Sequence, residues 1–127
     1  MANHATHAER FFKTAWFSKA ARKAHIADSE LCAAIRQVML GQADDLGGGV
    51  YKKRLSKNQY RSIILARGGK HWVFEFLFAK QDMANIPPED LFDLRQLAKT
   101  YAELTTEQFE NFLKNGDWKE ICDDHET

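Results

Sequence analysis

Cysteine, proline and long apolar runs are scarce in this sequence. Its 127 residues include two cysteines and two prolines. Cys32 and Cys122 lack the close paired spacing of a zinc knuckle or a disulfide framework, so we expect two reduced thiols. No apolar run approaches the roughly 20 residues of a membrane helix, and residues 1–10 lack the apolar stretch of a secretory signal. These absences predict a soluble, cytoplasmic protein that does not contact a membrane.

Patterns typical of metal sites are absent as well. His25 and His71 stand alone, and no histidines, cysteines or carboxylates recur at the spacing of metal ligands. We therefore expect a protein that uses neither a metal nor another cofactor.

The length and composition indicate one globular domain. Hydrophobic residues make up 44% of the chain and charged residues 28%, which suits a folded domain of this size around a single core. The two ends are small, polar or acidic. We predict flexible ends at residues 1–10 and 122–127 and a single folded domain from 11 to 121.

A net charge of zero conceals a strong segregation of charge. Between Val50 and Lys80 the chain carries eight basic residues and one acid, Glu75, a net charge of +7. Residues 1–49 contribute +1 and residues 81–127 contribute −8. A basic segment attracts anions, and its density of lysine and arginine points to the phosphates of a nucleic acid.

Hydrophobic periodicity and breaker residues predict an α+β fold, in which helices pack against a small twisted antiparallel sheet. Short connectors join three strands into an antiparallel meander, and the last of these is apolar on both faces, as a central strand would be. The glycines Gly47–Gly49 form a turn before the first strand of the meander. The expected strands are Phe11–Phe17, Val50–Leu55, Tyr60–Ala66 and His71–Ala79. The expected helices run from Ser18 to Ala24, from Asp28 or Ser29 to Gly41, from Pro88 through Tyr101, and from a cap at Thr105 or Thr106 to Asn115.

The cations of the meander are expected to gather on one face. Period-two geometry sends Lys52 and Arg54 to one side of their strand and Lys53 to the other. Arg61, at the start of the next strand, and Lys80, at the end of the last, converge on the same patch. Such a patch is either an anion site or a solvated basic face, and charge alone does not separate the two.

If the patch is catalytic, RNA is the substrate that fits it, because the 2′-hydroxyl supplies its own nucleophile. The site must then deprotonate that hydroxyl, neutralise the phosphorane and protonate the leaving 5′-oxygen. Positive neighbours lower the pKa of a lysine, so Lys52 is the expected general base, and Arg54 and Arg61 are expected to hold the phosphate. This mechanism is independent of metal.

Four sequence blocks occur in a fixed order: Gly-Gly-Gly-Val-Tyr-Lys-Lys-Arg-Leu, then Tyr-Arg, then Phe-Glu-Phe-Leu-Phe-Ala-Lys-Gln-Asp-Met-Ala-Asn-Ile, then Leu-Arg-Gln-Leu-Ala-Lys-Thr-Tyr. In this order they resemble the RelE/HigB-type toxins of bacterial toxin–antitoxin systems, in the RelE/ParE superfamily, over about Phe11 to Tyr101. The resemblance implies a microbial RNase-like fold and ribosome-dependent cleavage of messenger RNA, which arrests translation until a cognate antitoxin binds. An acidic helix or strand of the antitoxin is expected to cover the basic groove.

The resemblance also implies roles for individual residues. The expected catalytic cations are Lys52, Arg54, Arg61 and Lys80. The other bases of the segment are expected to bind RNA, namely Lys53, Lys57, Arg67 and Lys70.

The sequence departs from the family pattern around the proton donor. Gln81 stands where relatives often have a further arginine, and Pro87 lies where some have a catalytic tyrosine. A glycine-rich loop of this branch is shortened to residues 57–59. The identity of the general acid is therefore open, and the candidates are Asp82, Tyr60 and Tyr51. An aspartate in this position is more often a turn residue, and a tyrosine in a strand is more often part of the core.

Two other functions remain open. A relative of the ParE kind would share the fold and inhibit DNA gyrase by protein contact, and a non-catalytic relative would bind nucleic acid without turnover. The retained Lys52, Arg54 and Arg61 favour the nuclease. The acidic C-terminal region Glu103–Glu126 either forms a solvated helical cap or shades the basic groove when no RNA is present.

Overall fold

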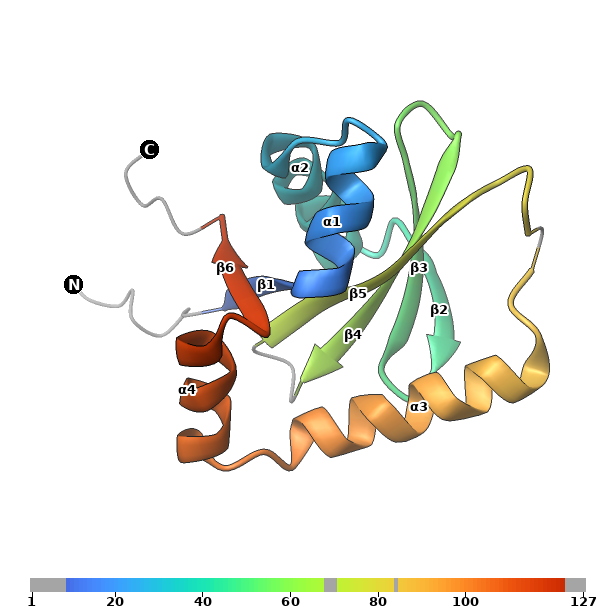
Figure 1. The fold of residues 1–127 in the computed structure, drawn as a ribbon. Coiled ribbons are helices and arrows are strands. Elements are labelled where there is room, and N and C mark those ends of the chain that lie inside the picture. The colour runs from blue at the N-terminus through green and yellow to red at the C-terminus, as the bar shows by residue number, and fades with distance from the viewer. Residues whose placement is uncertain (1–8, 68–70, 84, 123–127) are drawn as a thin grey trace.

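The computed structural model describes residues 9–67, 71–83 and 85–122 (Figure 1). Most of the two predicted flexible ends and Lys70 lie outside these residues, whereas Arg10 already belongs to the first strand. The elements in chain order are β1 (Arg10–Thr14), α1 (Ala15–Lys23), α2 (Asp28–Met39), β2 (Asp44–Gly47), β3 (Val50–Leu55), β4 (Tyr60–Arg67), β5 (His71–Ala79), α3 (Pro88–Ala102), α4 (Thr106–Asn115) and β6 (Trp118–Ile121).

The strands form one sheet in the order β2-β3-β4-β5-β1-β6. β3, β4 and β5 make the predicted antiparallel meander. β1 pairs parallel with β5, and β6 pairs antiparallel with β1. β5 therefore has neighbours on both sides, as expected of the central strand. The sheet is mostly antiparallel, and the predicted α+β class is confirmed.

Helices cover both faces of this sheet. α1 and α2 lie on one face, and α3 and α4 lie on the other (Figure 1). Phe17, Leu31 and Ile64 belong to the buried cluster on the α1/α2 side, whereas Ile63 and Phe109 belong to the cluster on the α3/α4 side. Adjacent residues of β4 thus enter different cores, as expected for a strand that is covered on both faces.

The first strand is shorter than predicted. β1 ends at Thr14, and Trp16 and Phe17 belong to α1. Thr14 Oγ1 accepts a hydrogen bond from the Phe17 N–H at 3.0 Å, which caps the helix one turn before the predicted cap at Ser18. Phe17 and Ala21 then lie one turn apart on the buried side of α1.

Two short edge strands were not predicted from the sequence: β2 lies where a turn was expected, and β6 lies between the last predicted helix and the predicted flexible end. β2 pairs with the first half of β3 through the glycine turn, in which Gly47, Gly48 and Gly49 have φ angles of 87°, 66° and 86°. β6 pairs with β1. A four-residue strand contains too few positions to show an alternating pattern, so periodicity could not reveal either one.

α4 begins and ends at its predicted signals. Thr105 Oγ1 accepts from the Gln108 N–H at 3.1 Å, and the Gln108 side chain accepts from the Thr105 N–H at 2.9 Å. Gly116 ends the helix with a φ angle of 82°. The reciprocal bonds between Thr105 and Gln108 satisfy backbone N–H groups that the first turn of α4 would otherwise leave without a partner, and the glycine ends the helix.

The expectation of two reduced thiols is wrong. Cys32 of α2 and Cys122, which follows β6, form a disulfide across a sequence separation of 90 residues. The bond ties the C-terminal edge strand to α2. Sequence spacing could not indicate it, because the two cysteines meet only after the sheet has placed β6 beside β1.

Loss of this disulfide is expected to lower the free energy of unfolding by about 2–4 kcal/mol, because the cross-link restricts the unfolded chain. Cys32→Ser, Cys122→Ser and the double variant should unfold at the same reduced urea concentration. The wild type should join them in dithiothreitol. Urea unfolding followed by tryptophan fluorescence measures these midpoints, and equal midpoints for the oxidised wild type and the double variant would contradict the expectation.

Candidate functional site

The register of β3 and β4 places two arginines side by side. Arg54 of β3 and Arg61 of β4 are direct partners across the antiparallel pair. Directly opposite residues project from the same face, with Cβ atoms about 4.5–5.5 Å apart. The pair Val50–Leu65, four residues farther along the same two strands, belongs to the core on the α3/α4 side. Because side chains alternate with a period of two, Lys52, Arg54 and Arg61 lie on that side as well.

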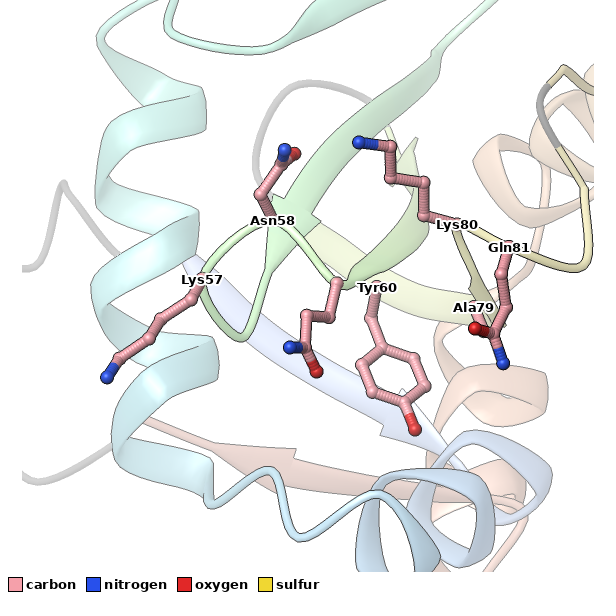
Figure 2. Close-up of a pocket in the computed structure, with 7 residues that line it drawn as sticks. Lys57, Asn58, Tyr60, Ala79, Lys80 and Gln81 are labelled. Atoms are coloured by element: carbon pink, nitrogen blue, oxygen red, sulfur yellow. The ribbon is translucent and has the colours of Figure 1, made fainter.

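Lys80 joins this face from the end of β5. Arg61 pairs with Phe78, which is buried on the α3/α4 side, and Lys80 follows two residues later. The Lys80 N–H donates to Gln59 O at 2.9 Å, which holds the residue beside the β3–β4 turn. Figure 2 shows the Lys80 and Tyr60 side chains pointing in opposite directions. The four residues that we call the cation face are Lys52, Arg54, Arg61 and Lys80.

The members of the cation face differ in their accessibility. Arg54 and Lys80 are exposed. Lys52 is half-buried, and its Nζ lies 3.6 Å from Oδ2 of Asp44 on β2. Arg61 is only 9% exposed. Arg54 and Lys80 are therefore the cations most open to a ligand from solvent.

The turn between β3 and β4 is held in an unusual conformation. Ser56, Lys57 and Asn58 have φ angles of 54°, 56° and 73°, a region that residues other than glycine seldom adopt. Arg61 Nη1 donates to Asn58 O at 3.0 Å, and the Glu30 side chain of α2 accepts from the Ser56 N–H. Strain of this kind costs on the order of 1–3 kcal/mol per residue, persists only where its surroundings enforce it, and clusters at binding sites.

Lys53 lies away from the cation face. Its Nζ donates to Gln42 O at 3.0 Å on the α1/α2 side of β3. Burial, and then the neighbouring Arg54 charge, lower the pKa of Lys53. A neighbouring positive charge, the effect predicted for Lys52, therefore acts on Lys53, which faces the other side of the strand.

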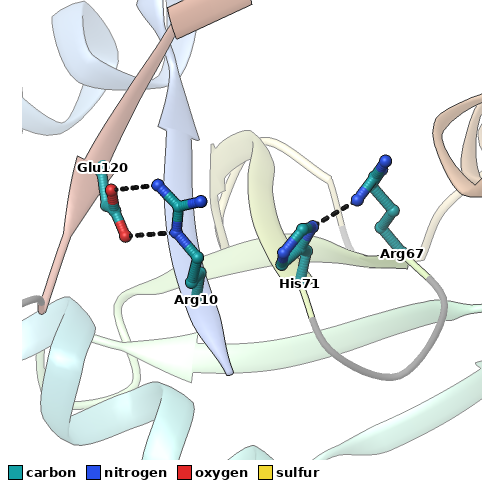
Figure 3. Close-up of polar contacts among 4 residues, drawn as sticks. All are labelled: Arg10, Arg67, His71 and Glu120. Carbon is teal, nitrogen blue, oxygen red and sulfur yellow. Dashed lines mark hydrogen bonds and ion pairs between the residues drawn. The ribbon is translucent and has the colours of Figure 1, made fainter. Parts of the chain in front are cut away.

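Arg67 lies at the far end of β4 and joins that strand to α3. Its Nε donates to Tyr101 O at 2.8 Å and its Nη2 to Leu104 O at 3.1 Å, while its Nη1 contacts His71 Nδ1 (Figure 3). The guanidinium also lies 4.9 Å from the ring centroid of Phe109, and burial lowers its pKa. These contacts occupy most of its donors, and a role in RNA binding stays a prediction.

Two hollows adjoin at the start of β4 and the end of β5. The first, of about 510 Å³, we call the turn hollow, and it is lined by residues 57–59 with Tyr60, Ala79, Lys80 and Gln81 (Figure 2). The second, of about 560 Å³, we call the α1 hollow, and its lining includes Trp16, Lys19, Lys23, Phe76 and Asp82. Tyr60, Ala79 and Gln81 border both hollows.

The candidates for the general acid lie away from the cation face. Tyr60 and Tyr51 pack against the core on the α1/α2 side, and Asp82 lines the α1 hollow. The identity of the acid therefore stays open. The α1 hollow itself was not predicted from the sequence, because the pattern placed Trp16 in a strand, and only the helical cap at Thr14 brings it beside Lys19 and Lys23.

Glu75, the one acid of the basic segment, bonds to α3. Tyr101 Oη donates to Glu75 Oε1 at 2.8 Å. Burial raises the pKa of Glu75, and the hydrogen bond from Tyr101 opposes that change. Burial and then the nearby Glu75 charge raise the pKa of Tyr101. The carboxyl group thus bonds on the α3 side, and the pair joins β5 to α3.

Comparison with known protein families covers almost the whole chain. Residues 9–121 match the model of the RelE toxin of the RelE / RelB toxin-antitoxin system. The chain belongs to the RelE toxin family. No curated protein and no solved structure gives a significant match. A RelE toxin is one half of a toxin–antitoxin system, so its partner is an antitoxin.

Among the described residues, no helix is long and apolar enough to cross a membrane. The same residues contain no group of three or more histidines, cysteines or acids that could hold a metal ion.

The Glu75–Tyr101 pair predicts a pH dependence of stability. Because folding raises the pKa of Glu75, the folded state favours its protonated form. Its contribution is fully present below the unfolded pKa and is lost as the pH rises through the folded pKa. Glu75→Gln keeps an acceptor for Tyr101 and removes the buried charge, so wild type should lose stability relative to this variant as the pH rises.

Urea unfolding midpoints from pH 4 to pH 8 measure this difference. Glu103→Gln, which removes a carboxylate from an exposed position, is the matched control. A difference between wild type and Glu75→Gln that stays constant, or that grows in favour of wild type with rising pH, would show that Glu75 does not titrate as inferred.

Proposed function

We propose that this RelE-family toxin is an endoribonuclease that cleaves messenger RNA, on the ribosome, and thereby arrests translation. The observation that carries the proposal is the pairing of Arg54 with Arg61 on one face, with Lys52 and Lys80 on the same side of the sheet. A phosphodiester on this face would meet cations from three strands. Such an arrangement suits a phosphoryl group whose negative charge grows during the reaction.

The proposed reaction uses the RNA 2′-hydroxyl as the nucleophile. Lys52 takes the proton from this hydroxyl, the 2′-oxygen bonds to phosphorus, and the bond from phosphorus to the 5′-oxygen breaks. The products are a 2′,3′-cyclic phosphate and a 5′-hydroxyl. Arg54 and Arg61 hold the non-bridging oxygens, because guanidinium groups bind phosphate through two parallel donors.

Two contacts bear on the proton transfers of this proposal. Lys52 accepts the proton as a neutral amine, so it must first leave the carboxylate of Asp44 and give its own extra proton to solvent. A pair at 3.6 Å with a 60% exposed partner is weak enough to open. Tyr60 and Asp82 lie toward the α1 hollow. We therefore assign the proton for the leaving 5′-oxygen to Lys80, the ammonium on the cation face at the end of β5.

Arg54→Ala is expected to lower the rate of RNA cleavage by about 100-fold, because one preorganised charge that stabilises a transition state is worth about 10²–10³ in rate. Arg54 is exposed, and it is a cleaner test than Arg61, which also holds the β3–β4 turn. The measurement is the cleavage of messenger RNA in a purified translation reaction, together with growth of cells that express each variant.

Lys99→Ala is the matched control, because Lys99 is an exposed cation of α3 outside the cation face. A single 2′-deoxy nucleotide at the mapped cut should block cleavage there if the 2′-hydroxyl is the nucleophile. If Arg54→Ala and Lys80→Ala both cleave like wild type, the cation face is not the site. Growth arrest with inhibited gyrase and intact transcripts would instead support the gyrase-inhibiting alternative.

A further inference from the structure

Trp16 is a large aromatic side chain that stays exposed at the start of α1. It is 52% exposed, although its ring stacks on Phe76 with centroids 5.2 Å apart and planes 27° apart. Phe76 in turn contacts Phe78, at 5.8 Å between centroids. The α1 hollow therefore has an aromatic wall whose outermost ring is open to solvent.

The α1 hollow exists because β1 ends before β5 does. β1 pairs with β5 from His71 to Phe74, and no other strand of the described chain continues along that side of β5. The chain turns into α1 at Ala15 instead, and α1 residues border the part of β5 that follows Phe74. Aromatic side chains therefore line the space between α1 and the end of β5.

Basic residues surround both hollows. Lys19 and Lys23 of α1 line the α1 hollow, and Lys57 and Lys80 line the adjoining turn hollow. Asp82 is the one acid among the residues that line the two. Stacking surfaces next to cations are the composition of a groove for single-stranded nucleic acid, in which bases stack on rings and phosphates meet lysines.

We propose that the α1 hollow is a base-stacking subsite, in which an unpaired RNA base stacks on Trp16 while Lys19 and Lys23 contact the flanking phosphates. This inference rests on the proposed nuclease function and extends it. The subsite is continuous with the cation face, because Tyr60, Ala79 and Gln81 border both hollows and Lys80 belongs to the turn hollow and to the cation face. One RNA strand would thus pass from the cleaved phosphate around the end of β5 to Trp16.

A flat base fits this hollow better than an added peptide strand. A strand that paired with the free edge of β5 would have to occupy the space that Trp16 and Ala20 of α1 and its C-cap residue Ala24 border. Strand addition also draws its affinity from a row of main-chain hydrogen bonds along an open edge. A single stacked ring needs only the exposed indole.

The test measures binding of a fluorescent, single-stranded RNA of about eight nucleotides, 2′-O-methylated throughout so that it cannot be cleaved. Trp16→Ala should weaken binding by about 5- to 150-fold, the range for the loss of one base–aromatic stack. Trp16→Phe keeps a ring and should stay within about threefold of wild type. Phe92→Ala removes an aromatic residue that is 59% exposed on α3, and it should bind like wild type.

Two further measurements separate stacking from charge. RNAs that each lack one base should be tested against both proteins. With wild type, removal of one particular base should weaken binding as much as Trp16→Ala does. With Trp16→Ala, removal of that base should weaken binding little further. The double variant Lys19→Ala/Lys23→Ala should flatten the dependence of affinity on salt by about 1.4 in log–log slope, whereas Trp16→Ala should leave the slope unchanged.

The outcomes distinguish the subsite from the nuclease. Trp16-dependent binding of the oligonucleotide, without cleavage of messenger RNA in the translation reaction, would retain the subsite and remove the proposed function. Cleavage by wild type, with Trp16→Ala equal to wild type in binding, would overturn the subsite alone. Trp16-dependent binding of an oligoglutamate peptide, with no binding of the RNA, would overturn it in favour of a protein ligand. Thermal unfolding of Trp16→Ala and Trp16→Phe shows whether each variant is folded.

Discussion

The antiparallel pairing of β3 with β4 is the constraint on which the cation face depends. Successive strand residues face opposite sides, so a slip of one residue would carry Lys52 and Arg54 to the α1/α2 side. The register is fixed because Val50 and Leu55, at the two ends of β3, are buried in different cores. A slip would replace the buried Leu55 by Arg54 or by Ser56, depending on its direction, and burial of an unpaired charge or polar group is far more costly than burial of an apolar group. Packing on the two faces of the sheet therefore positions charges that take no part in either core.

Arg61 links the stability of the hairpin to its chemistry. Its guanidinium donates to Asn58 O and Tyr60 O, and so supports a turn of three left-handed residues that do not include glycine. The same side chain lies opposite Arg54. A substitution at Arg61 would therefore disturb the turn hollow and the cation face together, and loss of activity there would not separate the two effects. In the part of the chain that the structure describes, the Arg54 side chain makes no hydrogen bond to the turn, and this difference makes Arg54 the more informative position.

Much of the fold could be predicted from the sequence, because local signals were strong where strands and helices were long. The meander, the glycine turn, α3 and both caps of α4 followed from periodicity, turn residues and capping residues. The remainder depended on contacts between distant segments: the disulfide of Cys32 with Cys122, the edge strands β2 and β6, and the parallel pairing of β1. For the site, alternation along the strands correctly separated Lys52 and Arg54 from Lys53, since side-chain direction is a local property. The burial of Arg61, the contacts of Arg67 and the α1 hollow could not be predicted, because each arises where an element ends against another.

In the described part of the acidic C-terminal region, residues 103–122, exposed acids lie on the helical cover of the α3/α4 face of the sheet. α3 and α4 turn apolar side chains such as Ala98, Tyr101 and Phe109 toward the sheet, whereas Glu103, Glu107 and Glu110 are exposed. Tyr101 and Phe109 also meet Arg67, so the cation that these helices contact lies at the opposite end of β4 from Arg61. Charges in solvent interact weakly beyond a Debye length of about 10 Å at 0.1 M salt, so exposed acids act mainly on their own surroundings. Segregation of charge along the chain thus becomes segregation in space, with Arg54 and Lys80 exposed beside the β3–β4 turn and acids exposed on the helical cover, and under the proposed function this arrangement would steer a polyanion toward the turn.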